Sequence, residues 1–358
     1  MNWTNKIYQI FIVLITSLCL LEIVFQFLPV SESSNLQNTN VNNHILYFKP
    51  NAKVRKTLGP FFNYSVVKAT NDMGYFSDEN RRDRGLKKVV LVVGDSFVEA
   101  SHVANKNTFH GILPKHFPGY TFLPMGVSGS PLSQYLAFIE DVKTELDPEL
   151  FIIPIISNDF DESLAKNNLM PGFYQYDSDF NLVMRQHRTQ NWYVNFLSKS
   201  AFIGYLYRDF KIISKINAVV NGDGKKNALY KDYGEDKFEE TQLVINKFIL
   251  DLHKIVGETR VLFILDSDRS ALYRKHNVDT PRYFPFSNYI KDAYLKFKVT
   301  CCENSNFHFI DMSNVFEDEI AKNRKLLDFS DVADGHWNER GHLAVSRTVQ
   351  EWMQGNGF

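Results

Sequence analysis

The apolar run Val89–Val93 limits the folds open to this chain more than any other segment. It reads Val-Val-Leu-Val-Val, so every position but one is β-branched. Such a run suits a strand that is buried on both faces of a parallel sheet. It stops at Gly94, where the backbone can turn tightly because glycine has no Cβ. Asp95 and Ser96 follow at once, at the end of a strand where open α/β sheets place their ligands.

A serine in this position has two interpretations. A nucleophile must be exposed, rigidly held and close to backbone N–H donors, and the end of a central strand meets these needs. Asp95 or Ser96 could equally cap the next helix, which is common after a strand. The segment alone does not separate the two, so partners further along the chain must decide.

The rest of the chain alternates strands with helices. Further strands are expected at 120–125, 150–156, 261–265 and 307–310, and helices at 108–113, 133–146, 239–256, 287–299 and 338–353. This alternation indicates a parallel sheet with helices on both faces, joined by right-handed crossovers. We predict a flavodoxin-like three-layer α/β/α sandwich with a five-stranded parallel sheet.

Residues 161–237 interrupt the alternation and are rich in aromatic side chains. The segment begins just after Asn158, so it starts beside the end of the third strand. Most of these rings must pack the insertion onto the main domain, and we expect a few to line a substrate cleft. The predicted boundaries are a membrane anchor at 1–30, a tether and extension at 31–87, and the main domain with its insertion at 88–358.

Ile7–Leu28 is nearly all apolar, with Glu22 as its only charge. It is long enough to cross the hydrocarbon layer, which takes about 20 helical residues. A cleaved signal peptide would have a shorter apolar core, about 7–15 residues, and small residues at its cut. Lys6 precedes the segment and the next cation is Lys49, so the positive-inside rule places the body outside the cytoplasm. We predict an uncleaved transmembrane helix in the cytoplasmic membrane, with the main domain on the periplasmic side.

Composition excludes several other classes of protein. The 358 residues carry a net charge of −1, which gives no indication of nucleic-acid binding. The three cysteines have neither zinc-site spacing nor the pattern of a disulfide framework. We therefore expect no cofactor, no metal and no nucleic-acid partner, and the sequence does not indicate an oligomeric state.

Four short groups carry the functional signal. They are Gly94-Asp95-Ser96 after the first strand, Gly126 after the second, Asn158 after the third, and Asp334-Gly335-His336 before the last helix. Each alone is ordinary turn or capping chemistry. Together, with three of them at the ends of strands, they form a strong signal.

His336 has other possible roles. It could cap the final helix, or it could bind a metal together with Asp334 and His342. Residues six apart on a helix face different sides, so a metal shared by the two histidines is disfavoured. We expect His342 to support the site or to pack.

The arrangement resembles the SGNH/GDSL family of serine esterases and acyltransferases, from about residue 88 to the carboxyl terminus apart from the insertion. The apolar helix, its Glu22 and the sequence NDMGYFSDE before the first strand resemble a membrane-anchored branch of that family from bacterial envelopes. The resemblance implies Ser96 as the nucleophile and His336 as the base. It also implies an oxyanion hole made by Ser96, Gly126 and Asn158.

The chain departs from the family pattern in two places. The family has glycine before the asparagine, where this chain has Ser157. The family's triad acid stands three residues before the histidine, whereas Asp334 stands two before His336. Asp-x-His is a spacing of the anchored branch, so we predict Asp334 as the acid and keep Asp331 as the alternative.

The resemblance implies a serine-dependent esterase or O-acyltransferase that works through an acyl-serine intermediate. Its substrates would be acyl esters, above all acetyl esters, of envelope or exported carbohydrate. The alternative is a non-catalytic carbohydrate-binding or assembly protein on the same fold, which Ser157 and the short Asp-to-His spacing support. The partners implied are the membrane, through the N-terminal helix, and a carbohydrate or other acyl-ester substrate.

Overall fold

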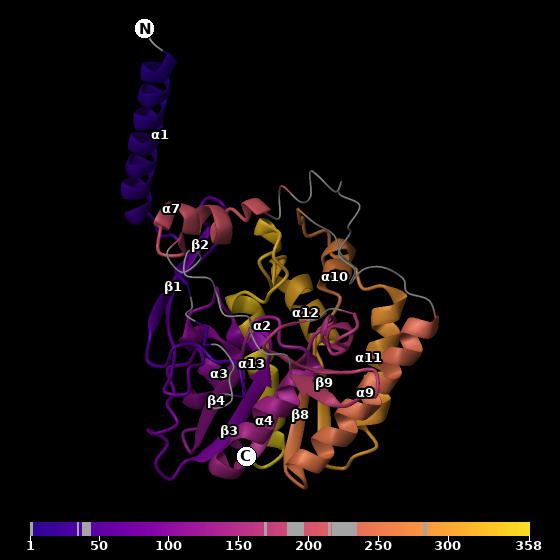
Figure 1. Ribbon diagram of the computed structural model, residues 1–358. Helices are drawn as coiled ribbons and strands as arrows, with labels where there is room; N and C mark the ends of the chain where they lie inside the picture. Colours follow the sequence, from indigo (N-terminus) through magenta and orange to yellow (C-terminus); the bar gives the residue numbers. More distant parts are fainter. Residues whose placement is uncertain are drawn as a thin grey trace. The chain divides into compact units, whose positions relative to one another are not determined.

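The five runs predicted as strands form one parallel sheet. Its order is β4-β3-β5-β8-β9, and each neighbouring pair is parallel (Figure 1). The strands are β3 (Lys88–Gly94), β4 (Tyr120–Gly126), β5 (Pro148–Ile155), β8 (Arg260–Leu265) and β9 (Phe307–Asp311). In chain order this is 2-1-3-4-5, the order of flavodoxin-like sheets. The predicted fold class is confirmed.

The computed structural model describes residues 3–33, 36–37, 44–167, 170–184, 197–213, 216, 235–281 and 285–358. The chain divides into two compact units. Unit 1 comprises Met1–Ser34, Val54–Val67 and Thr189–Lys225, and unit 2 comprises Asn35–Lys53, Lys68–Arg188 and Lys226–Phe358. The sheet and all four predicted site segments belong to unit 2.

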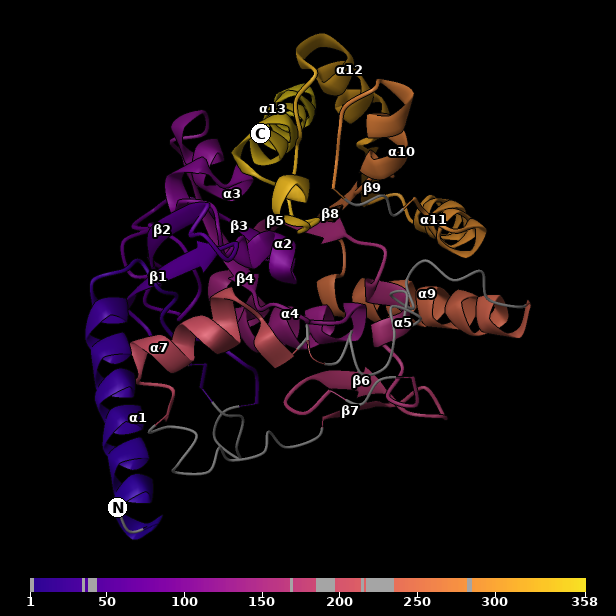
Figure 2. The same ribbon diagram turned by 90° about the horizontal axis from the view of Figure 1, so that it is seen from above.

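Helices cover both faces of the sheet in unit 2. Helix α9 packs against α4 and α11, while α13 packs against α3 and α12. Figure 2 shows α4 and α9 on the opposite side of the sheet from α12 and α13. The helices of unit 2 are α2 (Ser96–Glu99), α3 (Phe109–Ile112), α4 (Leu132–Leu146), α5 (Asp159–Glu162), α9 (Glu235–Val256), α10 (Arg269–Lys275), α11 (Asn288–Cys301), α12 (Ser313–Asn323) and α13 (Glu339–Gly355).

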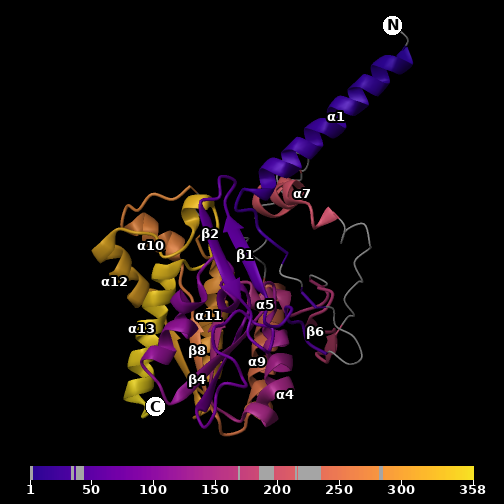
Figure 3. The ribbon, with the colours of Figure 1, turned by 90° about the vertical axis from the view of Figure 1, so that its left-hand side faces the viewer.

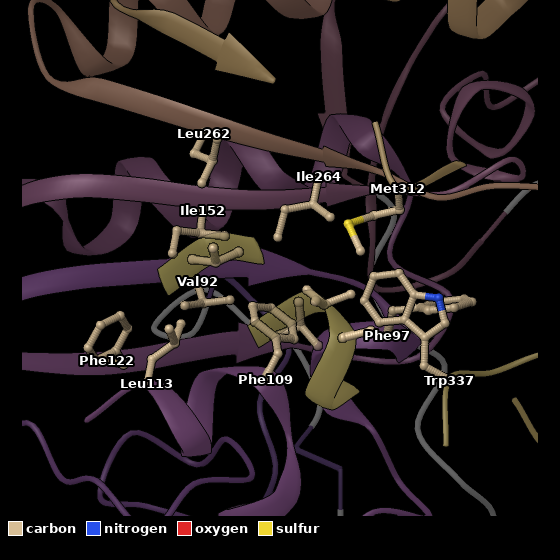
Figure 4. Close-up of a cluster of buried hydrophobic side chains, with 14 of the residues drawn as sticks. Val92, Phe97, Phe109, Leu113, Phe122, Ile152, Leu262, Ile264, Met312 and Trp337 are labelled. Carbon is tan, nitrogen blue, oxygen red and sulfur yellow. The ribbon is translucent and has the colours of Figure 1, made fainter. Parts of the chain in front are cut away.

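Alternate strand residues supply the core on the α13 side. Val92, Ile152 and Ile264, from three neighbouring strands, are fully buried there (Figure 4). Phe109, from α3, and Trp337, from the loop before α13, close the same cluster. Because side chains alternate along a strand, the residues between them face the other helical layer. The continuous apolar runs are therefore explained by burial on both faces.

The two prolines inside strands sit where the missing N–H is tolerated. Pro124 lies in β4, the edge strand. Pro154 lies in the central strand β5, but β3 pairs with β5 only as far as Ile152. A proline lacks one ladder donor, so an edge or the end of a pairing accommodates it.

Some elements differ from their predicted form. Helices α10 and α12 were not expected from the sequence. The single helix expected at 108–113 is instead α3 followed by a 3₁₀ turn at Leu113–Lys115, with Pro114 in the first turn of that second element. Proline is tolerated at this position because the N–H of a first-turn residue has no helical partner.

The predicted insertion contributes to both units. In unit 2 its described part contains the antiparallel pair β6 (Tyr174–Tyr176) and β7 (Leu182–Met184). Residues 168–169, 185–196, 214–215 and 217–234, including the aromatic residues Trp192, Tyr193 and Phe196, lie outside the described residues.

Unit 1 contains the apolar N-terminal helix. Its elements are α1 (Trp3–Gln26), α7 (Ala201–Gly204), a π-helical turn, η3 (Tyr205–Asp209), and all but the outer ends of β1 (Lys53–Leu58) and β2 (Tyr64–Ala69). Asn5–Gln26 spans 22 residues at a mean hydropathy of 2.3, so α1 can cross a bilayer by length and composition. Figure 3 shows α7 beside the end of α1, and the two helices are in contact.

Candidate active site

Ser96 lies at the turn between β3 and α2. Gly94 and Gly126 pair in register, so β3 and β4 end at the same level. Asp95 caps α2, because its carboxylate accepts the backbone N–H of Phe97 at 2.9 Å. The capping role therefore falls to Asp95, and the Ser96 hydroxyl contacts His336 Nε2 at 2.8 Å.

His336 and Asp334 form the second half of the site. His336 Nδ1 lies 2.5 Å from Asp334 Oδ1, and the same oxygen accepts the backbone N–H of His336 at 3.0 Å. A carboxylate on Nδ1 fixes the tautomer, so Nε2 is free of hydrogen and can accept a hydrogen bond from the Ser96 hydroxyl. The two-residue spacing works because one carboxylate oxygen binds both the ring and the main chain of His336.

Asp331, the alternative acid, lies in a separate 3₁₀ turn, Ser330–Val332, and is exposed. The carboxylate at His336 Nδ1 belongs to Asp334. Of the two acids left open by the sequence, the structure brings Asp334 to the imidazole.

The surrounding charges favour a protonated imidazole. Burial alone would lower the pKa of His336, but the hydrogen bond that its ring donates to Asp334 and the charges of Asp334, Asp95 and Glu99 outweigh burial and raise that pKa. Burial would likewise raise the pKa of Asp334, but His336 holds it well below its usual range. An imidazolium at this position is therefore stabilised by its neighbours.

The pH dependence of turnover follows from this shift. His336 accepts the serine proton only when neutral, so the raised pKa should place the acidic limb of kcat/KM above pH 6.5. Asp95→Asn keeps a capping side chain but removes one of the charges that raise the pKa, so it should move that limb to lower pH. A pH–rate profile measures both effects, with Asp331→Asn as the matched charge control. An unmoved limb in Asp95→Asn would contradict this account.

The predicted oxyanion residues lie at the ends of β4 and β5. At Gly126 a Cβ would come within 2.7 Å of both Glu99 N and Val98 Cβ, so only glycine lets α2 approach this closely. Asn158 is the N-cap position of α5, directly before Asp159, and its side-chain amide donates to Glu162 at 2.8 Å. The amide carries two N–H groups, and this contact uses one. The oxyanion role of Gly126 and Asn158 stays a prediction.

A cavity of about 270 Å³ opens beside His336. It lies at the carboxyl ends of the strands, where open α/β sheets bind ligands, and its lining is mostly polar. The lining residues are Phe97, Ile156, Ser157, Asn158, Asp266, Ser267, Asp268, Arg269, Ser270, Phe286, Asp328, Ser330, Ala333, Asp334, Gly335 and His336. Asn158 and His336 thus face one hollow, as predicted oxyanion donor and base would.

No protein-family model and no curated protein sequence matches this chain. Similar solved structures include a lipase/acylhydrolase from Enterococcus faecalis (11% identity, TM-score 0.41, covering 75% of this chain and 96% of that one). A lipolytic G-D-S-L protein from Veillonella parvula DSM 2008 has 11% identity, a TM-score of 0.42 and coverages of 75% and 98%. A catalytic mutant of an acetylxylan esterase from Geobacillus stearothermophilus has 14% identity, a TM-score of 0.39 and coverages of 76% and 94%.

These similar structures are a lipase/acylhydrolase, a lipolytic protein and an acetylxylan esterase. The chemistry open to this chain follows from its own Ser96, His336 and Asp334.

The sequence did not single out Glu99. Its side chain is buried, and one carboxylate oxygen accepts the backbone N–H of Ser128 at 2.6 Å. The buried Lys68 donates to the carbonyl oxygens of Glu99 and Ala100 at 2.9 and 2.6 Å. The bond from Ser128 joins the turn after Ser96 to the loop after Gly126, and the two bonds from Lys68 hold that turn in place.

Arg269 was also missed. It is buried, at 8% exposure, and binds Asp266 and Asp328, the latter at 2.8 Å. Its third contact, at 2.5 Å, is the carbonyl oxygen of Gly335, between the proposed acid and base. Trp337 donates to Asp266 at 3.0 Å from the other side of the loop. Arg269 thus fixes the loop that carries Asp334 and His336.

Replacing Arg269 should destabilise the protein strongly. Arg269→Met leaves two buried carboxylates without their counterion, which typically costs about 3–5 kcal/mol of unfolding free energy. Urea unfolding measures the change. Arg274→Met, an exposed change on the same helix, should stay within roughly 0.5 kcal/mol of wild type. Equal unfolding free energies for the two variants would show that Arg269 does not stabilise the loop that carries Asp334 and His336.

Asn158→Ala should lower turnover by roughly 100–1000-fold, the usual effect of losing one oxyanion donor. Because the donor acts in the transition state, kcat should fall far more than KM changes. Glu162→Gln keeps an acceptor for the Asn158 amide and should cost much less. Steady-state kinetics on a soluble ester separate these outcomes, and near-wild-type turnover in Asn158→Ala would exclude it from the hole.

Proposed function

We propose that this protein is a serine-dependent esterase or O-acyltransferase acting on short acyl esters of carbohydrate. The observation that carries the proposal is the continuous contact from Ser96 Oγ to His336 Nε2, at 2.8 Å, and from His336 Nδ1 to Asp334, at 2.5 Å. A base within hydrogen-bond reach of the nucleophile, held in turn by a third group, is the arrangement that activates serine.

The reaction would proceed in two steps, the acylation and then the deacylation of Ser96. The Ser96 hydroxyl oxygen attacks the ester carbonyl carbon while His336 Nε2 takes the hydroxyl proton. The carbonyl oxygen becomes an oxyanion, for which the N–H groups of Ser96 and Gly126 and the amide of Asn158 are the proposed donors. Collapse breaks the bond to the alcohol, which leaves with the proton from His336. Water or a sugar hydroxyl then attacks the acyl-serine by the same route and releases Ser96.

The cavity favours a short acyl group and a polar alcohol. Its volume of about 270 Å³ is small beside the ~300–1,000 Å³ of common ligand pockets. Its lining includes Asp268 and Ser270 as well as the amide of Asn158, so a hydroxyl-bearing group would find polar partners. These features support an acetyl ester of a sugar over a long-chain lipid.

The proposed location is the extracytoplasmic side of the cytoplasmic membrane. The apolar length of α1 supports a membrane anchor, and the placement of Lys6 before it supports a cytoplasmic amino end. Envelope or exported carbohydrate would then be the accessible substrate.

Serine-directed fluorophosphonate labelling of the full chain tests the enzyme proposal, together with hydrolysis of p-nitrophenyl acetate and p-nitrophenyl octanoate. We expect labelling and a higher kcat/KM for the acetate. Release of free acetate from an acetylated oligosaccharide regardless of added acceptor would favour hydrolysis, and ping-pong transfer to a sugar acceptor would favour an acyltransferase. A folded chain that takes no label would favour the alternative, a carbohydrate-binding protein.

A further inference from the structure

The end of the apolar helix is fastened to a second segment of unit 1. Glu22 lies four residues before the end of α1, or about 6 Å along the helix axis. Its carboxylate accepts the hydroxyl of Ser200 at 2.6 Å and the backbone N–H groups of Ala201 and Phe202 at 2.9 and 3.2 Å. A carboxylate in an apolar helix is costly without partners, and these three donors explain why Glu22 is tolerated there.

Further contacts fix the same segment just past the end of α1. Phe25 packs against Phe202 and Tyr205, with ring centroids 5.2 and 4.7 Å apart. Arg208 Nε donates a hydrogen bond to the carbonyl oxygen of Ser31 at 2.7 Å, and the backbone N–H of Ser31 donates to the Asp209 carboxylate at 3.0 Å. The segment is therefore held on both sides of the residue where the apolar helix ends.

The outward face of this segment is apolar. Tyr207 is 67% exposed and Ile213 is 53% exposed. Phe27, directly after α1, and Phe61, in the turn between β1 and β2, are exposed at 86% and 85%. Phe62, beside Phe61, packs against a ring of the segment, so these exposed side chains belong to one region of unit 1.

The charges of the segment are mostly cationic. Residues 197–213 contain Lys199, Arg208 and Lys211 and a single acid, Asp209. Asp209 is buried against Ser31, whereas Lys199 and Lys211 are exposed. Exposed aromatic and aliphatic residues flanked by lysines are typical of chain that lies in a lipid headgroup layer.

We propose that residues 197–213 lie in the headgroup layer of the membrane and form a second membrane contact beside α1. The proposal rests on the proposed anchoring of α1 in the bilayer. The contacts that Glu22, Phe25 and Ser31 make with residues 200–209 place the segment at the level where α1 leaves the hydrocarbon. The exposed side chains of Tyr207 and Ile213 supply the apolar surface. An anionic lipid surface complements Lys199 and Lys211.

Depth measurement on the full chain in lipid vesicles tests this contact. A background with Cys19→Ala and Cys302→Ser leaves only the buried Cys301. An environment-sensitive fluorophore is then attached to Tyr207→Cys, Ile213→Cys or the control Val67→Cys. Val67 belongs to the same unit and is 59% exposed, but lies within β2, about 10 Å along the strand from its first residue, Tyr64.

We expect blue-shifted emission and quenching by spin-labelled lipid at positions 207 and 213, and neither effect at 67. Phosphatidylglycerol should increase the quenching over phosphatidylcholine alone, and Lys199→Gln with Lys211→Gln should remove that increase. If the chain floats with the vesicles but positions 207 and 213 behave like 67, the second contact is absent while the anchor stands. Blue-shifted emission without lipid quenching would overturn the proposal in favour of a protein partner. A chain that fails to float would refute the anchor itself.

Discussion

Ser96→Ala should reduce ester turnover by about 10⁶-fold and abolish fluorophosphonate labelling, because the Ser96 hydroxyl is the group in contact with the proposed base, His336. The residual rate would reflect only binding and the oxyanion donors. The hydroxyl is small and partly exposed, so the unfolding free energy should change little. Initial rates on p-nitrophenyl acetate, with circular dichroism to verify folding, measure the effect.

The matched control for this experiment is Ser267→Ala. Ser267 lines the cavity beside His336, and its buried hydroxyl makes no hydrogen bond among the residues that the structure describes. Losing an unpaired hydroxyl should cost little, so Ser267→Ala should keep both turnover and labelling. If Ser96→Ala retained labelling or turned over near the wild-type rate, the catalytic proposal would be lost.

The second large effect is expected from Asp334→Asn, with kcat lower by about 10⁴-fold. An amide at this position can stabilise the wrong tautomer of His336 and cannot stabilise the imidazolium, whereas the loop geometry is retained. Asp331→Asn, three residues earlier and exposed, should leave turnover close to wild type. Steady-state kinetics of the two variants, measured side by side, decide which carboxylate serves the histidine.

The opposite ranking of the two variants would mean that the loop rearranges when substrate binds. Equal, small effects would indicate that neither carboxylate is needed, which would favour the non-catalytic alternative.

The order of the sheet could be predicted because its strands are continuous apolar runs separated by amphipathic helices. Helix α10 could not be predicted, because Asp266-Ser267-Asp268 resembles an ordinary end of a strand. In the structure Asp268 caps α10 by accepting the backbone N–H of Ala271 at 2.9 Å. Helix α12 is short, and its apolar positions Phe316 and Ile320 are too few to stand out in the sequence.

The contacts around the site are less accessible to sequence analysis than the site residues themselves. Serine, histidine and asparagine at strand and helix ends form a recognisable pattern. Arg269 and Asp328 are 59 residues apart, and nothing in their local sequence connects them. Spacing also left Asp331 and Asp334 open, because the deciding contact depends on how tightly the loop turns at Gly335.

The short turn from Asp334 to His336 makes acid and base a single piece of chain. A shift of β3 against the rest of the sheet would change one distance, from hydroxyl to imidazole, and would leave the imidazole with its carboxylate. Any such displacement would therefore lengthen the contact between the Ser96 hydroxyl and His336 Nε2, which is 2.8 Å in the structure, and would leave the orientation of the imidazole unchanged.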